Sequence, residues 1–246
     1  MFKKLFVVGV AALLAACGGG GGGGGGDAGT GGGMVGVWVD TKYPDTGRIV
    51  IDTRGQFWTL SVDSLVNPTY AVVGNGIISD DGTTVSAAGY NTVVSQYTIA
   101  GAYLKAGGSY TGNTAHLTVE DGFNGTNSYS LSRLAETSTT GAIPTGVYST
   151  YAGFIVFNGA SGYRISPAIS VNGNRISGVS EGCSWSGSLK DTGHGFSEVT
   201  ITFSNSSNCL APGKTASGVA GYGDGRLITM LRLDADFRTM FLVVAQ

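Results

Sequence analysis

The chain has 246 residues, of which 42% are apolar and 12% are charged, about half of the usual charged share of ~25%. This apolar content excludes disorder throughout the chain. The formal net charge is −2, from 14 basic and 16 acidic residues, so there is no electrostatic reason to expect a nucleic-acid partner. Glycine is strongly over-represented, with 43 residues.

The first 16 residues have the organisation of a secretory signal peptide. Lys3 and Lys4 form a positive start, and residues 5–16 carry no charge. A membrane-spanning helix needs about 20 apolar residues, so this segment is too short to be one. We therefore predict a signal peptide over residues 1–16.

The signal ends in Leu14-Ala15-Ala16-Cys17, which resembles the lipobox of bacterial lipoproteins. The resemblance implies that the chain is cut before Cys17, which then carries a diacylglycerol and an acylated amine. The alternative is an ordinary signal peptide with a chance cysteine. Several acyl chains on one residue would hold the protein permanently, since each buried methylene contributes ~0.8 kcal/mol. Gly18 follows where an aspartate often marks inner-membrane retention in that family, which implies the outer membrane of a Gram-negative cell.

Residues 17–33 are predicted to be the lipidated cysteine and a flexible tether. Residues 18–26 are all glycine, and residues 31–33 are glycine again. Such a segment buries no apolar surface, and glycine loses much backbone entropy on ordering. A flexible coil of about 16 residues has a mean span of roughly 20–24 Å.

The remaining sequence alternates with period two, which is typical of strands. Residues 48–52 and 56–62 predict a hairpin around Thr53-Arg54-Gly55. Further strands are predicted at 70–78, 93–104, 115–119, 128–134, 153–158, 163–170, 184–189, 198–203, 227–233 and 239–244. Glycine-containing turns are predicted at 75–76, 80–82, 107–108, 121–122 and 124–125. No window of twelve or more residues carries a convincing helical stripe with caps.

We predict an all-β fold, an antiparallel meander that forms one or two small barrels or sandwiches. Residues 34–134 would form one β domain, residues 135–145 a linker and residues 146–246 a second β domain. Each flank has about 100 residues, enough for about eight strands. Gly36-Val37-Trp38 resembles Gly146-Val147-Tyr148, and residues 47–52 resemble 153–158. Two explanations of this similarity stay open: the two halves arose by duplication of one β domain, or short hairpins with glycine turns simply resemble each other.

The lipobox cysteine, glycine-rich tether and glycine-punctuated meanders together loosely resemble Gram-negative surface lipoproteins built from small β-barrels. Transferrin-binding protein B and factor H-binding protein are of this kind, and they bind host proteins. The resemblance covers the organisation of the chain and no specific motif. It therefore implies a binding role but transfers no binding residues.

Cys183 and Cys209 form an even pair in an oxidising compartment, which favours a disulfide. The bridge would close a loop of about 26 residues and stabilise by roughly 3 kcal/mol. A metal or nucleophilic site is the rival, but two cysteines cannot complete a zinc shell, and His116 and His194 are the only histidines. We expect no metal and no cofactor.

A catalytic motif is matched at one place only, and weakly. Residues 178–182 fit the nucleophile-elbow pattern around Ser180, but the elbow needs a helix after it, and a hairpin-like stretch follows. The tryptophans Trp38, Trp58 and Trp185 lie in strand patterns and are predicted to be core residues.

The sequence thus predicts a non-enzymatic, lipid-anchored outer-membrane protein that binds or displays something. Its partners would be the membrane, through the anchor, and an unidentified protein or glycan, but no nucleic acid. One alternative is a periplasm-facing structural or envelope-assembly lipoprotein. A second is a hydrolase whose site is assembled from scattered residues. The sequence leaves surface and periplasmic orientation open.

Overall fold

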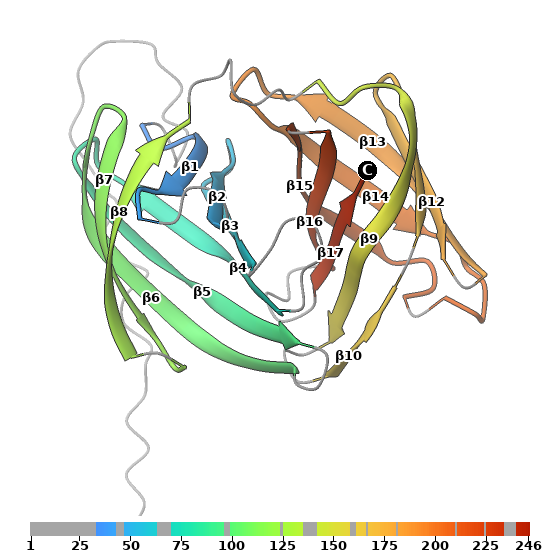
Figure 1. The fold of residues 1–246 in the computed structure, drawn as a ribbon, viewed down its shortest axis with the longest axis horizontal. Coiled ribbons are helices and arrows are strands. Elements are labelled where there is room, and N and C mark those ends of the chain that lie inside the picture. The colour runs from blue at the N-terminus through green and yellow to red at the C-terminus, as the bar shows by residue number, and fades with distance from the viewer. Residues whose placement is uncertain are drawn as a thin grey trace, which may run out of the picture.

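The computed structural model describes residues 33–42, 47–62, 70–95, 99–123, 125–134, 142–157, 161–165, 167–180, 182–209, 211–223, 225–233 and 240–246. These residues form two closed antiparallel β-barrels that lie side by side (Figure 1). The predicted all-β fold class is confirmed. The predicted signal peptide, Cys17 and nearly all of the tether lie outside the described residues, as does most of the segment 135–145.

The first barrel is an eight-stranded meander in which every strand pairs with its neighbour in sequence. The strand β1 also pairs with β8, which closes the barrel. Closure leaves no exposed edge, as suits a chain with few charges to protect one. The strands are β1 (Gly36–Asp40), β2 (Gly47–Ile51), β3 (Gln56–Val62), β4 (Tyr70–Asp80), β5 (Thr84–Ser95), β6 (Ile99–Thr111), β7 (Thr114–Asp121) and β8 (Gly125–Arg133).

The second barrel closes through pairing of its long first strand, β9, with its last, β17. The short strands β10 and β11 pair in turn with the late and early parts of β9, so together they occupy one position in the barrel. The strands are β9 (Gly146–Phe157), β10 (Ser161–Arg164), β11 (Ala168–Asn172), β12 (Arg175–Ser180), β13 (Cys183–Asp191), β14 (Ser197–Phe203), β15 (Thr215–Gly223), β16 (Arg226–Leu233) and β17 (Met240–Ala245).

The predicted hairpin of β2 and β3 is present, and Asp52 holds its turn. This carboxylate is fully buried and accepts hydrogen bonds from the backbone N–H groups of Arg54 and Gln56, each at 2.9 Å. It also pairs with the Arg54 guanidinium at 2.7 Å. Gly55 adopts a φ of 71°, a conformation that favours glycine in a tight turn.

Several predicted strands and turns are wrong. The predicted strand 93–104 spans the end of β5 and the start of β6, and the predicted strand 163–170 is divided between β10 and β11. The predicted strands also omit β1, β12, β15, most of β5 and the early part of β9. The turns predicted at Asn75-Gly76 and Gly107-Gly108 lie inside β4 and β6. There the missing side chains make room inside the barrel instead of allowing a turn.

The resemblance between the two halves holds for one pair of segments only. Gly36-Val37-Trp38 begins β1 and Gly146-Val147-Tyr148 begins β9, so both open a barrel. The second pair is not equivalent, because residues 47–51 form the separate strand β2, whereas residues 153–157 are the later part of β9. Of the two pairs of similar segments, only the first therefore occupies equivalent positions in the two barrels.

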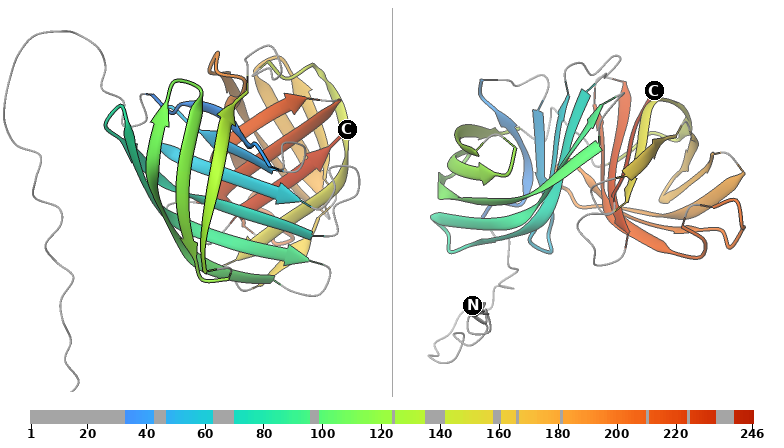
Figure 2. Two further views of the ribbon diagram at one scale, coloured as in Figure 1. Left: turned by 60° about the vertical axis from the view of Figure 1, so that its left-hand side comes forward. Right: turned by 90° about the horizontal axis from the view of Figure 1, so that it is seen from below.

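The outer walls of the two barrels pack against each other, as the view from below also shows (Figure 2). Trp58 points outward from β3 yet is fully buried there, with the Arg232 guanidinium of β16 centred 6.0 Å from its ring. Thr53 donates a hydrogen bond across the contact to Glu198, at 2.5 Å. Trp38 and Trp185 are buried inside the first and second barrel, so the prediction of all three tryptophans as core residues is confirmed.

Candidate functional site

The interior of the first barrel contains a cavity of about 320 Å³. An eight-stranded barrel is just wide enough either to be filled by side chains or to hold one small ligand. This volume is at the lower end of the usual range of ligand pockets, ~300–1,000 Å³. Its deep wall is apolar and is made by Ile51, Phe57, Ile78, Leu104, Leu117 and Leu131.

The cavity exists because inward-facing positions on β4, β5 and β6 are small. Gly76 of β4 faces Gly89 of β5, and Ala87 of β5 faces Ala106 of β6. The Phe57 ring covers both glycines, since an added Cβ would lie 2.5 Å from it at Gly76 and 2.7 Å at Gly89. Both alanines line the cavity, and their short side chains leave its space unfilled.

Beyond the deep wall, larger side chains fill the barrel. Trp38 is fully buried and donates its indole N–H to the Met34 carbonyl at 2.8 Å. The Arg133 guanidinium stacks 4.7 Å from the centre of the Trp38 ring. The Tyr110 hydroxyl donates to Asp80 at 2.8 Å. These contacts close the barrel on the side where β4 ends and β5 begins.

The other end of the cavity is polar. Asp40 is the last residue of β1 and Asp121 the last residue of β7, and both line the cavity beside Tyr129. Asp40 accepts the backbone N–H of Lys42 at 2.9 Å, and Asp121 accepts that of Phe123 at 2.7 Å. Burial raises the pKa of the Tyr129 hydroxyl, and the negative charges of Asp121 and Asp40 raise that pKa further. The two carboxylates thus act on the same region of the cavity.

Asn91, on β5, adds a buried acceptor to this polar end. Its side chain is 9% exposed, and its Oδ1 atom has no hydrogen-bond partner. The side chain lies over Gly74, where an added Cβ would be 2.1 Å from Oδ1 and 2.4 Å from the Thr59 hydroxyl. A buried polar atom without a partner costs about 1–3 kcal/mol, and because this oxygen has almost no accessible surface, the cost falls on the folded protein.

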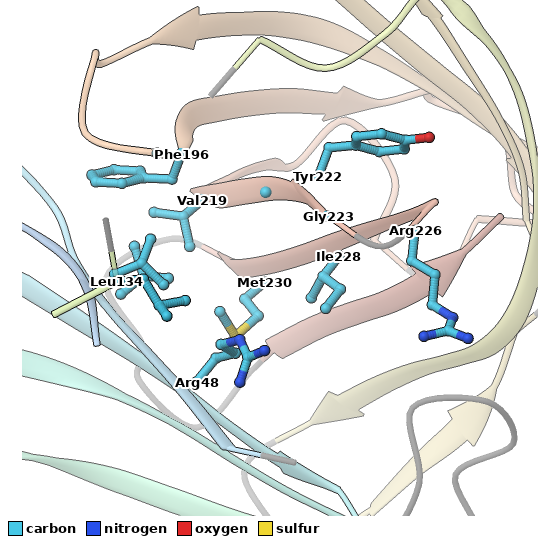
Figure 3. A pocket seen from close by; sticks show the side chains of 13 residues that line it. Arg48, Leu134, Phe196, Val219, Tyr222, Gly223, Arg226, Ile228 and Met230 are labelled. Atoms are coloured by element: carbon cyan, nitrogen blue, oxygen red, sulfur yellow. The ribbon is translucent and has the colours of Figure 1, made fainter. Parts of the chain in front are cut away.

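A second hollow, of about 240 Å³, lies between the two barrels (Figure 3). Phe196 and Val219 of the second barrel lie on one side of it, and Leu134 lies near them. The side chains of Arg48, Arg226 and Met230 also line it (Figure 3). This hollow belongs to the surface where the two barrels pack together. Its walls are mainly apolar, and its two charged side chains are both cations, Arg48 and Arg226.

The structure contains the predicted disulfide between Cys183 and Cys209. It joins the start of β13 to the segment that follows β14 in the second barrel. Cys17, the predicted lipidation site, lies outside the described residues. Among the residues that the structure describes, no group of three or more His, Cys, Asp or Glu side chains could hold a metal ion, and no helix is long and apolar enough to cross a membrane.

The serine and histidines that a hydrolase site would need, Ser180, His116 and His194, lie far apart in the structure. Ser180 ends β12 and is followed by the strand β13, not by the helix that a nucleophile elbow requires. His194 lies in the turn at the far end of β13, a strand of nine residues, which at ~3.4 Å per residue separates the two by roughly 30 Å. His116 is on β7 of the other barrel, where its ring contacts Ser130 at 3.1 Å.

Sequence reasoning missed the cavity and its polar residues. Comparison with known protein families, with curated proteins and with solved structures finds no match. The cavity in the first barrel is therefore the feature from which a function can be argued.

Proposed function

We propose that this protein is a non-enzymatic, lipid-anchored binding protein of the outer membrane, and that its first barrel holds a small, largely apolar molecule. The cavity inside that barrel carries the proposal, because its deep wall is apolar and its polar groups are few and gathered at one end. Ligand sites have this composition in general. The second barrel, whose interior is a continuous apolar cluster that includes Trp185 and Ile201, would support the first.

Binding can be tested with the neutral fluorophore N-phenyl-1-naphthylamine, whose emission rises in apolar surroundings. The variant Ala87→Phe places a ring in the cavity, and Ala88→Phe places the same ring on the exposed outer face of the same strand. We expect the wild type and Ala88→Phe to bind the probe and Ala87→Phe to lose at least about tenfold in affinity. Equal binding by all three proteins would refute an interior site.

The lipid anchor is supported by the sequence Leu14-Ala15-Ala16-Cys17 and by the glycine-rich segment that follows it. Two or more acyl chains on Cys17 would moor the barrels to the bilayer, whereas one chain binds only marginally. Cys17→Ser should abolish metabolic labelling with radioactive palmitate, and labelling that persists would contradict the anchor. Protease added to intact cells would cleave a surface protein and leave a periplasmic one intact.

A further inference from the structure

The hollow between the barrels exists because two outward positions of β15 are glycine. Successive residues of a strand face opposite sides of the sheet. Ala220 and Tyr222 pack against the interior cluster of the second barrel, whereas Val219 packs against the first barrel. Gly221 and Gly223 therefore also face the first barrel, and a Cβ added at either would meet no heavy atom within 4 Å. The apolar contact between the barrels stops at these glycines, and the hollow begins there.

Three side chains of β16 lie in a row along the hollow (Figure 3). Met230 and Ile228 belong to the apolar cluster between the barrels, and Arg226 occupies the next position on the same side of the strand. Ile228 pairs in register with Gly221, and Arg226 with Gly223. From Met230 to Arg226 the row spans about 14 Å, at ~3.4 Å per residue. It is therefore apolar along most of its length and ends in a cation.

The guanidinium group of Arg226 has no anionic partner in the described part of the chain. It forms no ion pair there, and its Nε atom is buried without a hydrogen-bond partner. Burial of Nε takes part of the charged group out of water, so an anion at the two terminal nitrogens would replace lost hydration. Among the described residues that line the hollow there is a second cation, Arg48, and no Asp or Glu. The hollow therefore favours a negatively charged ligand.

The size and the walls of the hollow limit what this ligand can be. Its volume of about 240 Å³ is below the usual range of ligand pockets, ~300–1,000 Å³. It equals the share of about eight water molecules in the liquid, at ~30 Å³ each, so a ligand of roughly eight to ten non-hydrogen atoms would fill it. Val37 and Val50 of the first barrel face the row on β16 and add apolar wall. The ligand is thus short, with an apolar body and one anionic end.

We propose that the hollow between the barrels binds a short-chain carboxylate, with its carboxylate on the terminal nitrogens of Arg226 and its chain along Ile228 and Met230. This is a second site, independent of the cavity inside the first barrel. Two parallel hydrogen bonds from the guanidinium would fix the carboxylate, and the chain would continue the apolar contact past the two glycines. A neutral alcohol lacks the ion pair, and an ammonium group would meet the like charge of Arg226.

The test uses the purified full-length protein and three probes of equal chain length, octanoate, 1-octanol and octylamine, in calorimetric titrations at pH 7. Each probe is titrated into the wild type and into Ala87→Phe, in which the cavity of the first barrel is closed. In Ala87→Phe we expect octanoate to bind about tenfold more tightly than 1-octanol, or about 1.4 kcal/mol, and octylamine to bind more weakly than both. Raising the salt concentration should weaken octanoate binding and leave 1-octanol binding unchanged.

Two substitutions in the Ala87→Phe protein locate the site. Arg226→Gln should lower the affinity for octanoate about five- to tenfold without changing that for 1-octanol. Arg175→Gln is its matched control, because Arg175 is an exposed residue of β12 that does not line the hollow. Gly221→Phe places a ring in the hollow and should abolish octanoate binding. Its control is Gly107→Phe on β6, where an added Cβ would meet no heavy atom nearer than 3.8 Å.

The outcomes also separate this site from the proposed function of the first barrel. Octanoate affinity no greater than that for 1-octanol, or equal effects of Arg226→Gln and Arg175→Gln, would overturn the carboxylate site. If Gly221→Phe does not fold, Gly223→Phe tests the same space, and undiminished octanoate binding would again overturn the site. Binding of N-phenyl-1-naphthylamine should be unchanged in Gly221→Phe. Octanoate binding in a protein that fails to bind that fluorophore would support the hollow and refute the cavity of the first barrel as a site.

Discussion

Removing the disulfide by Cys183→Ala together with Cys209→Ala should destabilise the second barrel by roughly 3.5 kcal/mol. The two cysteines are 26 residues apart in sequence. In the chain-entropy model, a closed loop of this length lowers the entropy of the unfolded chain by about 12 cal/mol/K, which is about 3.5 kcal/mol at 25 °C. Cys209 is buried, with 5% exposure. We choose alanine because serine would place a hydroxyl group in this buried position, so the change in the free energy of unfolding reports mainly on the bridge.

Urea unfolding of the oxidised wild type and the double variant measures this effect. For an m-value of about 2 kcal/mol/M, the midpoint should fall by about 1–2 M. Tryptophan fluorescence includes Trp185, two positions after Cys183 on β13, and the bound naphthylamine probe reports on the first barrel separately. Ser184→Ala, an exposed neighbour, is the control. Coincident transitions of the wild type and the double variant would refute the reasoning.

Two further predictions concern turns of the first barrel. Asp52→Ala leaves the N–H groups of Arg54 and Gln56 without their acceptor, so the free energy of unfolding in urea should fall by about 2–4 kcal/mol; an unchanged value would show that this turn does not depend on the carboxylate. Asp81 has a pKa lowered from 3.8, first by the hydrogen bonds from the Thr84 side chain and backbone and then by that from Thr83. Its contribution to stability is therefore present above pH 3.8 and is lost as the pH falls toward the lower folded pKa. Acid unfolding of Asp81→Asn should lack that loss between about pH 4 and pH 2, and a profile that parallels the wild type would contradict this assignment.

Much of the architecture follows from local alternation. The residues of β14 alternate between buried and exposed positions over its whole length, and this period-two pattern is visible in the sequence. The hairpin around Gly55 was predictable because a turn sequence separates two such runs. The disulfide was predictable because the cysteines after Cys17 are only two. These features depend on neighbours in sequence or on counting, not on how the barrel closes.

The cavity was not predictable from the same patterns, because its parts meet only across strands. Gly76 and Gly89 are in register on β4 and β5, yet a glycine in a single sequence usually indicates a turn. Asp40 and Asp121 end strands at opposite ends of the first barrel's sequence, and closure of β1 against β8 brings them to one end of the barrel. A search for small residues at alternate positions of three successive strands would have been the useful signal.

The two barrels show that the partner of a small residue decides its effect. In the second barrel, Gly178 faces Trp185, and an added Cβ would lie 2.2 Å from the indole ring, so the large ring occupies the space that the glycine leaves. In the first barrel, Ala87 faces Ala106, and neither residue is compensated by a larger neighbour. Closely packed interiors are more stable than hollow ones, since a cavity costs about 24 cal/mol per Å³. A hollow interior is therefore costly for the free protein, and a bound ligand that fills the cavity would offset that cost.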